Sequence, residues 1–228
     1  MTTESARQHN LYLEDTYCFQ TEAVVIANGT DENGDWIALN PNIFHPRGGG
    51  QLEDLGTVNA QEVSVKRLSE GLVALYGAAA LSVGETVSCA IDEEARLRNA
   101  ALHTAGHLLG FIGEERGWVH KGHSHFPGQS RMDFDPDSLD IPVSTEEDRA
   151  AAKTMMQQRL TQLISTDGTV SSSIDESGNR TVTIEGVNSE PCGGTHVRHL
   201  GQIADAAIGE AKVKRGVYKI RYDATHIR

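Results

Sequence analysis

Residues 92–116 read DEEARLRNAALHTAGHLLGFIGEER, and this stretch determines how the second half of the chain is expected to fold. Asp92 is a helix-capping residue and two glutamates follow it, so a helix is expected to run from Asp92 to about Arg116. On a helical wheel, one side of this helix is an apolar stripe made up of Leu97, Ala101, Ala105, Leu108 and Ile112. His103 and His107 fall away from that stripe. They are therefore expected to face a ligand instead of the hydrophobic core.

The second informative stretch is CGGTH at 192–196. His103 and His107 are four residues apart, as are Cys192 and His196, and together they offer three imidazoles and one thiolate. This set suits a divalent metal, most naturally zinc. We expect one Zn²⁺ per chain at these four residues. The four residues could form a closed structural metal site. Alternatively, a substrate or water could reach the metal and be polarised by it.

Short apolar and β-branched segments precede the helix and are separated by turn residues: EAVVIA, DWIAL, EVSVKRL, LVALY and TVSCAI. This pattern predicts a small β-barrel domain over residues 1–91. Residues 92–228 combine the helix with a second one, expected from a Ser144–Glu147 capping box to about Ile164, and with several strand-like segments. The second domain is therefore expected to be α+β, and the chain as a whole falls in the α+β class.

Composition limits the classes of function. The formal net charge of −12 argues against sequence-independent coating of nucleic acid. A local exception is KVKRGVYKIR at 212–221, which is either the solvated face of a hairpin or a local basic surface. No apolar run approaches the ~18 residues that span a bilayer, and the first residues do not read as a signal peptide. We therefore expect a cytoplasmic protein without membrane contact.

Five stretches in order carry a family resemblance: FHPRGGGQLEDLGTV at 44–58, RNAALHTAGHLLG at 98–110, RMDFD at 131–135, CGGTHV at 192–197 and IGEAKVKRGVYKIRY at 208–222. They resemble the editing region of alanyl-tRNA synthetases, and especially the free-standing alanyl-tRNA editing proteins of the AlaX type. The resemblance implies the medium, two-domain form, in which a β-barrel precedes an editing domain of the threonyl/alanyl-tRNA synthetase type. It also implies hydrolysis, in trans, of tRNA(Ala) charged with serine or glycine.

The resemblance assigns roles to particular positions. Residues with expected catalytic roles are His103, His107 and His120; those expected to contact substrate or tRNA are Arg47, Gly48, Gly49, Gly50, Gln51, Lys121, Arg131 and Asp133. Two positions depart from the family pattern. Leu52 stands where a proline usually follows the glutamine, and His120 stands where a glutamine is frequent. His120 is a candidate contact to the substrate hydroxyl or to water.

Several alternatives stay open at this stage. The glycines at 48–50 could form a turn between strands or admit the tRNA acceptor stem close to the backbone, with Arg47 contacting a phosphate. HKGHSHF at 120–126 could form a second metal site, although alternating histidines on an exposed strand are the simpler interpretation. The rival functions are a zinc hydrolase of a small ester or amide and a non-catalytic tRNA-binding module with structural zinc. The sequence does not give the oligomeric state.

Overall fold

The computed structural model describes residues 8–78 and 80–227. They form two compact units. The barrel unit comprises the chain up to Gly48 together with Leu52–Arg96, and the helix–sheet unit comprises Gly49–Gln51 and the chain from Leu97 onward. The expected division into domains 1–91 and 92–228 stays a prediction.

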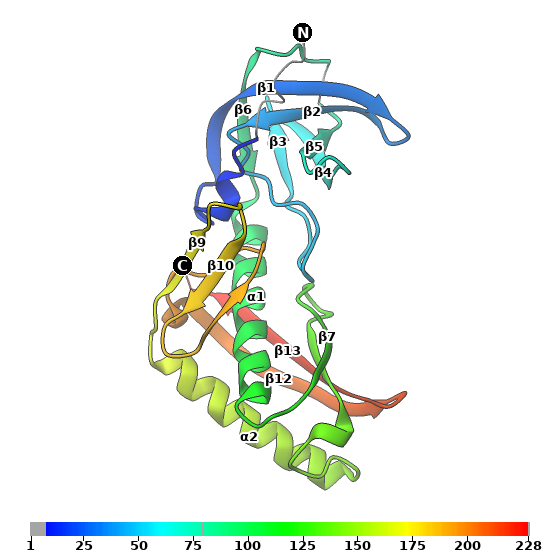
Figure 1. The fold of residues 1–228 in the computed structure, drawn as a ribbon, viewed down its shortest axis with the longest axis vertical. Helices are drawn as coiled ribbons and strands as arrows, with labels where there is room; N and C mark the ends of the chain where they lie inside the picture. The colour runs from blue at the N-terminus through cyan, green and yellow to red at the C-terminus, as the bar shows by residue number, and fades with distance from the viewer. Residues whose placement is uncertain (1–7, 79, 228) are drawn as a thin grey trace. The chain divides into compact units, whose positions relative to one another are not determined.

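The barrel unit is a closed six-stranded barrel in the order β1-β2-β5-β4-β3-β6, with β6 pairing back onto β1 (Figure 1). Its strands are β1 Gln20–Asp31, β2 Gly34–Asn40, β3 Gly56–Val58, β4 Gln61–Arg67, β5 Val73–Tyr76 and β6 Thr86–Ile91. Alternate residues point inward along β1 and β4, as the period of two in their sequences requires. Closure leaves no unpaired strand edge in the barrel.

The helix–sheet unit contains two helices and two antiparallel sheets. The helices are α1 Glu93–Glu114, which begins in the barrel unit, and α2 Glu146–Ser165. A four-stranded sheet has the order β12-β13-β8-β7, with β7 His120–Ser124, β8 Arg131–Phe134, β12 Ile203–Lys214 and β13 Val217–His226. A three-stranded sheet consists of β9 Val170–Ile174, β10 Arg180–Ile184 and β11 Asn188–Pro191. Short 3-10 helices occupy Leu11–Leu13, Pro136–Ser138 and Leu200–Gln202.

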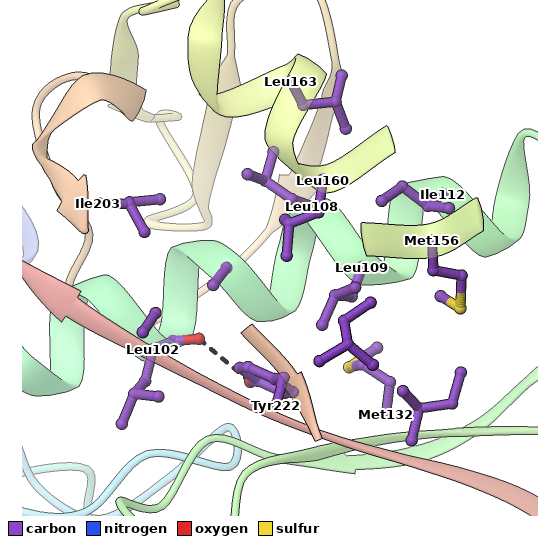
Figure 2. Close-up of a cluster of buried hydrophobic side chains, with 14 of the residues drawn as sticks. Leu102, Leu108, Leu109, Ile112, Met132, Met156, Leu160, Leu163, Ile203 and Tyr222 are labelled. Carbon is purple, nitrogen blue, oxygen red and sulfur yellow. Dashed lines mark hydrogen bonds between the residues drawn. The ribbon is translucent and has the colours of Figure 1, made fainter. Parts of the chain in front are cut away.

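The core of the helix–sheet unit lies between the two helices and the inward face of the four-stranded sheet. Figure 2 shows Leu108, Leu109 and Ile112 of α1 meeting Met156, Leu160 and Leu163 of α2. The sheet contributes Met132 of β8 and Tyr222 of β13, and the Tyr222 hydroxyl donates a hydrogen bond of 3.1 Å to the Leu102 carbonyl. This packing fixes α1 against β13 and so determines where the outward side chains of α1 lie.

The helix predictions are confirmed with one correction. Asp92 caps α1, since its Oδ1 accepts a 2.9 Å hydrogen bond from the Ala95 N–H, and all five residues of the predicted apolar stripe are buried. The capping box of α2 is formed by Thr145 and Asp148, not by Ser144 and Glu147. Both pairs have the required spacing, but only Thr145 lies at the turn where the helix starts.

The five predicted strand segments of the first unit all form strands. The barrel contains a further strand, β3, that the sequence did not predict. It is three residues long and includes Gly56, so it carries almost no periodic signal. Among the described residues, no helix is long and apolar enough to cross a membrane.

Candidate metal centre and active site

Helix α1 presents His103 and His107 from the side away from its apolar stripe. Spacing of four residues places both side chains on one face, about one turn apart. Two glycines make room on this face: a Cβ on Gly106 would overlap the ring of His125, and one on Gly110 would lie 3.3 Å from Met132. The glycines therefore let the His125 and Met132 side chains pack closely against the helix face that carries the two histidines.

The loop after β11 carries Cys192 and His196. The Arg180 side chain of β10 anchors this loop, because its Nη1 donates 2.8 Å hydrogen bonds to the carbonyls of Cys192 and Gly194. The absence of a side chain at Gly194 is essential, since a Cβ there would overlap the His103 ring. Gly193 has no neighbour within 4 Å of its would-be Cβ. A side chain could therefore be accommodated at position 193 but not at position 194.

The four predicted ligands converge on one point. Their candidate ligand atoms all lie within 4.8 Å of one another, and Cys192 Sγ lies 3.5 Å from His103 Nε2 and 3.3 Å from His196 Nε2. A tetrahedral zinc ion, bound at about 2.0–2.1 Å by nitrogen and 2.3 Å by sulfur, holds neighbouring ligand atoms about 3.3–3.6 Å apart. The spacing and the chemistry of the donor set both fit this metal.

The second nitrogen of each ligand histidine has its own partner. His103 Nδ1 lies 2.7 Å from Gln51 Oε1, and His196 Nδ1 lies 3.1 Å from Thr104 Oγ1. His107 Nδ1 lies 3.7 Å from a carboxylate oxygen of Glu190. The contacts of His103 and His196 fix the orientation of these two rings, whose Nε2 atoms both approach Cys192 Sγ.

Burial holds the ionisable ligand groups in their neutral forms. Burial lowers the pKa of His107 to about 4, helped by the nearby His123 and Arg180, so the ring stays neutral and can act as a ligand. Burial also raises the pKa of the Cys192 thiol. A thiolate in this place therefore requires a compensating positive charge, which a bound metal ion supplies.

A pocket of about 270 Å³ opens beside the cluster. His107 and Cys192 are half-buried and line it, together with Glu114, Glu190 and His120. Its volume lies below the range of about 300–1,000 Å³ typical of drug-sized ligands. The pocket therefore suits a small group, such as an amino acid attached to a larger molecule.

A row of stacked histidines forms one wall of the pocket. The rings of His120 and His123 stack with centroids 5.3 Å apart, His123 and His125 at 4.8 Å, and His125 and His103 at 4.4 Å. The expectation of alternating histidines on an exposed strand is correct for His120 and His123. It is wrong for His125, which is buried and makes a 2.5 Å hydrogen bond with the Tyr222 hydroxyl.

The glycine-rich segment is divided between the two units. Gly49 and Gly50 have φ of +54° and +75°, which favours glycine, and Gly49 lines the pocket. The Gln51 side chain is fully buried beside His103, so its atoms face the ligands and not a surface on which RNA could lie. In the barrel unit, Gly48 is exposed and Arg47 forms a two-pronged ion pair with Glu53 at 2.6 and 2.9 Å.

The other candidate substrate contacts lie outside the pocket. Lys121 is exposed on β7 and pairs with Asp135 at 2.7 Å. Arg131 and Asp133 lie on the opposite face of β8 from Met132, and Arg131 Nε contacts Asp133 Oδ2 at 3.2 Å. The structure thus brings the four metal candidates together, places three of them (His103, His107 and Cys192) and His120 at one pocket, and leaves Lys121, Arg131 and Asp133 elsewhere.

Sequence reasoning did not identify several groups at the pocket. Glu114 is at the last turn of α1, and burial next to Glu190 raises its pKa. Glu190 itself lies two residues before Cys192, a position that could have been flagged by its proximity to a ligand. Thr104 lies between the two α1 ligands and reads as an ordinary helix residue, since its partner His196 is 92 residues away.

Comparison with known proteins agrees with this geometry. Residues 180–221 match the family described as the threonyl and alanyl tRNA synthetase second additional domain. The chain is 28% identical to the alanyl-tRNA editing protein AlaX-M of Methanosarcina acetivorans, over 90% of this chain and 93% of that protein. The AlaX-M of Methanosarcina mazei is also 28% identical, over 90% and 91% respectively.

Similarity extends to a much longer class of protein. The alanine–tRNA ligase of Desulfosudis oleivorans is 31% identical over 81% of this chain, which spans only 24% of the ligase. Two classes of relative are therefore matched, the editing proteins over more than 90% of their length and the ligase over about a quarter. The chain is a homologue of the AlaX-M alanyl-tRNA editing proteins and is similar to one part of alanine–tRNA ligases.

Proposed function

We propose that this chain is an aminoacyl-tRNA deacylase that acts in trans and hydrolyses tRNA(Ala) charged with serine or glycine. The observation that carries the proposal is a four-ligand cluster with three members, His103, His107 and Cys192, at a small pocket, in a chain similar to alanyl-tRNA editing proteins along almost its full length. The proposed architecture is a β-barrel domain followed by an editing domain of the threonyl/alanyl-tRNA synthetase type. We place the protein in the cytoplasm, where charged tRNA is found.

The proposed metal is one Zn²⁺ held by His103, His107, Cys192 and His196. When bound, zinc supplies a positive charge that polarises the ester carbonyl or orients water at the pocket. The pocket's size admits the aminoacyl group while the rest of the tRNA stays outside. Glu114 and Glu190 place negative charge at the pocket, which complements the α-ammonium group of an aminoacyl ester.

Proton transfer is assigned to the exposed part of the histidine row. His120 lines the pocket and is the proposed contact to the attacking water or to the seryl hydroxyl. His123 stacks on it, and partial desolvation lowers the pKa of His123, so this ring is neutral near pH 7 and can accept a proton. We propose His120 and His123 as the two candidates for the general base.

The experiment that tests the function combines metal analysis with deacylation of Ser-tRNA(Ala), Gly-tRNA(Ala) and Ala-tRNA(Ala). We expect the zinc-loaded protein to release serine or glycine and to leave alanine attached. Full deacylation activity in metal-free protein would show that the reaction does not need zinc. Binding of tRNA without hydrolysis would favour a non-catalytic module, and neither binding nor hydrolysis would favour a hydrolase of small esters or amides.

Two neighbouring glycines provide a matched pair of variants. Gly194→Ala inserts a methyl group into the His103 ring, so zinc affinity should fall by about 10–100-fold and deacylation should fall with it. Gly193→Ala has open space around the same atom and should retain both properties. Equal zinc content and equal activity in the two variants would contradict the proposed ligand geometry.

A further inference from the structure

The outward face of the four-stranded sheet is strongly basic. Figure 1 shows β12 and β13 as a long hairpin, and its turn is formed by Arg215 and Gly216, both with positive φ. A shallow groove on this face is lined mainly by basic residues: Arg131, Lys212, Lys214, Arg215, Lys219 and Arg221. We call these six residues the basic face. The KVKRGVYKIR segment supplies five of them, and β8 supplies Arg131.

Strand register places like charges directly opposite one another. Lys212 of β12 is paired with Lys219 of β13, and Arg221 of β13 is paired with Arg131 of β8. Like charges in direct cross-strand pairs destabilise a sheet. These two pairs therefore lower the stability of the sheet, and the fold does not need them.

Acidic residues offset this charge only in part. Glu210 lies 3.0 Å from Lys212, and Asp133 lies 2.7 Å from Lys219 and 3.2 Å from Arg131. Two carboxylates thus face six basic side chains, in a chain whose formal net charge is −12. This concentration of positive charge is local and follows three adjacent strands.

The basic residues lie on the outward face of these strands because the inward face is apolar. Tyr218, Ile220 and Tyr222 alternate with Lys219 and Arg221 along β13 and are buried in the core. The hairpin therefore requires apolar residues on one face only. A neutral polar residue would satisfy the outward positions equally well, so the fold does not account for the choice of lysine and arginine.

We propose that the basic face binds the phosphate backbone of the tRNA, as a surface separate from the pocket. The charges are spread over several strands and are exposed or partly exposed, which suits an extended polyanion better than a single small anion. This inference rests on the proposed function, because tRNA is the polyanion that the pocket requires. It gives the six residues of the basic face a role in substrate affinity and none in the chemical step.

The test compares two double variants of the full-length protein with equal charge change. Lys214→Glu/Arg221→Glu alters the basic face, and Lys66→Glu/Lys153→Glu alters exposed residues of β4 and α2. Binding of uncharged tRNA(Ala) is measured by fluorescence anisotropy between about 50 and 200 mM salt. We expect the basic-face variant to bind at least about 10-fold more weakly, with a salt slope reduced by about two phosphate contacts. The control variant should lose much less.

Kinetics on Ser-tRNA(Ala) separate binding from chemistry. The basic-face variant should show a raised KM with kcat close to wild type, and its zinc content and circular dichroism should be unchanged. Equal tRNA affinity in both variants would overturn the inference. It would also be overturned if the basic-face substitutions weakened binding to anionic vesicles but left binding to tRNA unchanged. If the wild-type protein binds tRNA through this face but hydrolyses no ester, the inference stands and the proposed function fails.

Discussion

The two compact units each bury a cluster of polar side chains, and the clusters are built on opposite plans. In the barrel unit, Arg96 is fully buried, and its guanidinium donates to Asp54 and to the carbonyls of Thr16 and Ile43. The Asp54 carboxylate also accepts a 2.6 Å hydrogen bond from the His45 N–H. Donors and acceptors face one another throughout this cluster.

In the helix–sheet unit the arrangement is reversed. Three imidazole nitrogens and one sulfur, all potential acceptors, point at a single place, and the outer nitrogens of the rings contact Gln51, Thr104 and Glu190. The first cluster pairs its charged groups with protein atoms alone, whereas the second groups four ligand atoms that could hold a cation. The comparison teaches that convergence of like groups, and not burial of polar groups, marks a ligand site.

The largest expected effect comes from breaking the complete cluster. Arg96→Met leaves Asp54 buried without its ion pair, so the free energy of unfolding should fall by about 3–5 kcal/mol. Chemical denaturation measures this loss. Arg98→Ala is the control, since Arg98 pairs with the half-exposed Asp223 and its loss should cost at most about 1 kcal/mol. A similar cost for both variants would show that the buried cluster has no special role in stability.

Acid should weaken the same cluster through His45. Burial lowers the pKa of His45 to about 4, against 6.5 when unfolded. Between these values the unfolded chain binds a proton that the folded chain does not, so stability falls as pH decreases from 6.5 to 4, by on the order of 3 kcal/mol. The His45→Gln variant should lose this part of the pH dependence in denaturation curves. Identical pH profiles for variant and wild type would refute the assignment.

The smallest expected effect concerns the contacts around the converging cluster. Gln51→Ala removes the oxygen that lies 2.7 Å from His103 Nδ1, so zinc affinity should fall by about 10–100-fold. Competition with a zinc-binding indicator measures the change. Gln51→Glu keeps an acceptor at this position and should lose less than Gln51→Ala. Unchanged affinity in Gln51→Ala would mean that the ring is oriented by packing alone.

Local sequence pattern predicts much of this fold and of the candidate site. The helical wheel separates His103 and His107 from the stripe of Leu97 and Leu108, and period-two segments identify the strands from β1 to β6 with the exception of β3. These features are local, because the periodic pattern that predicts each helix or strand lies entirely within that element. The pairing of His103 with His107 also follows from spacing, since two residues four apart on a helix must share a face.

Long-range contacts could not be predicted in the same way. The burial of His125 depends on the ring of His103 and the hydroxyl of Tyr222, which is 97 residues away. The position of Gln51 depends on contacts with His103 and with Thr195, which is 144 residues away. The opposed like charges on β8, β12 and β13 require the strand register, which no single segment specifies.

The assignment of Gly49–Gln51 to the helix–sheet unit makes that unit discontinuous in sequence. A fragment that starts at Asp92 would contain all four ligands and both helices, yet it would lack the amide that orients His103. Excising the second unit as one continuous piece would therefore yield a metal site with altered affinity. A fragment that keeps the contact between Gln51 and His103 has to include residues 49–51.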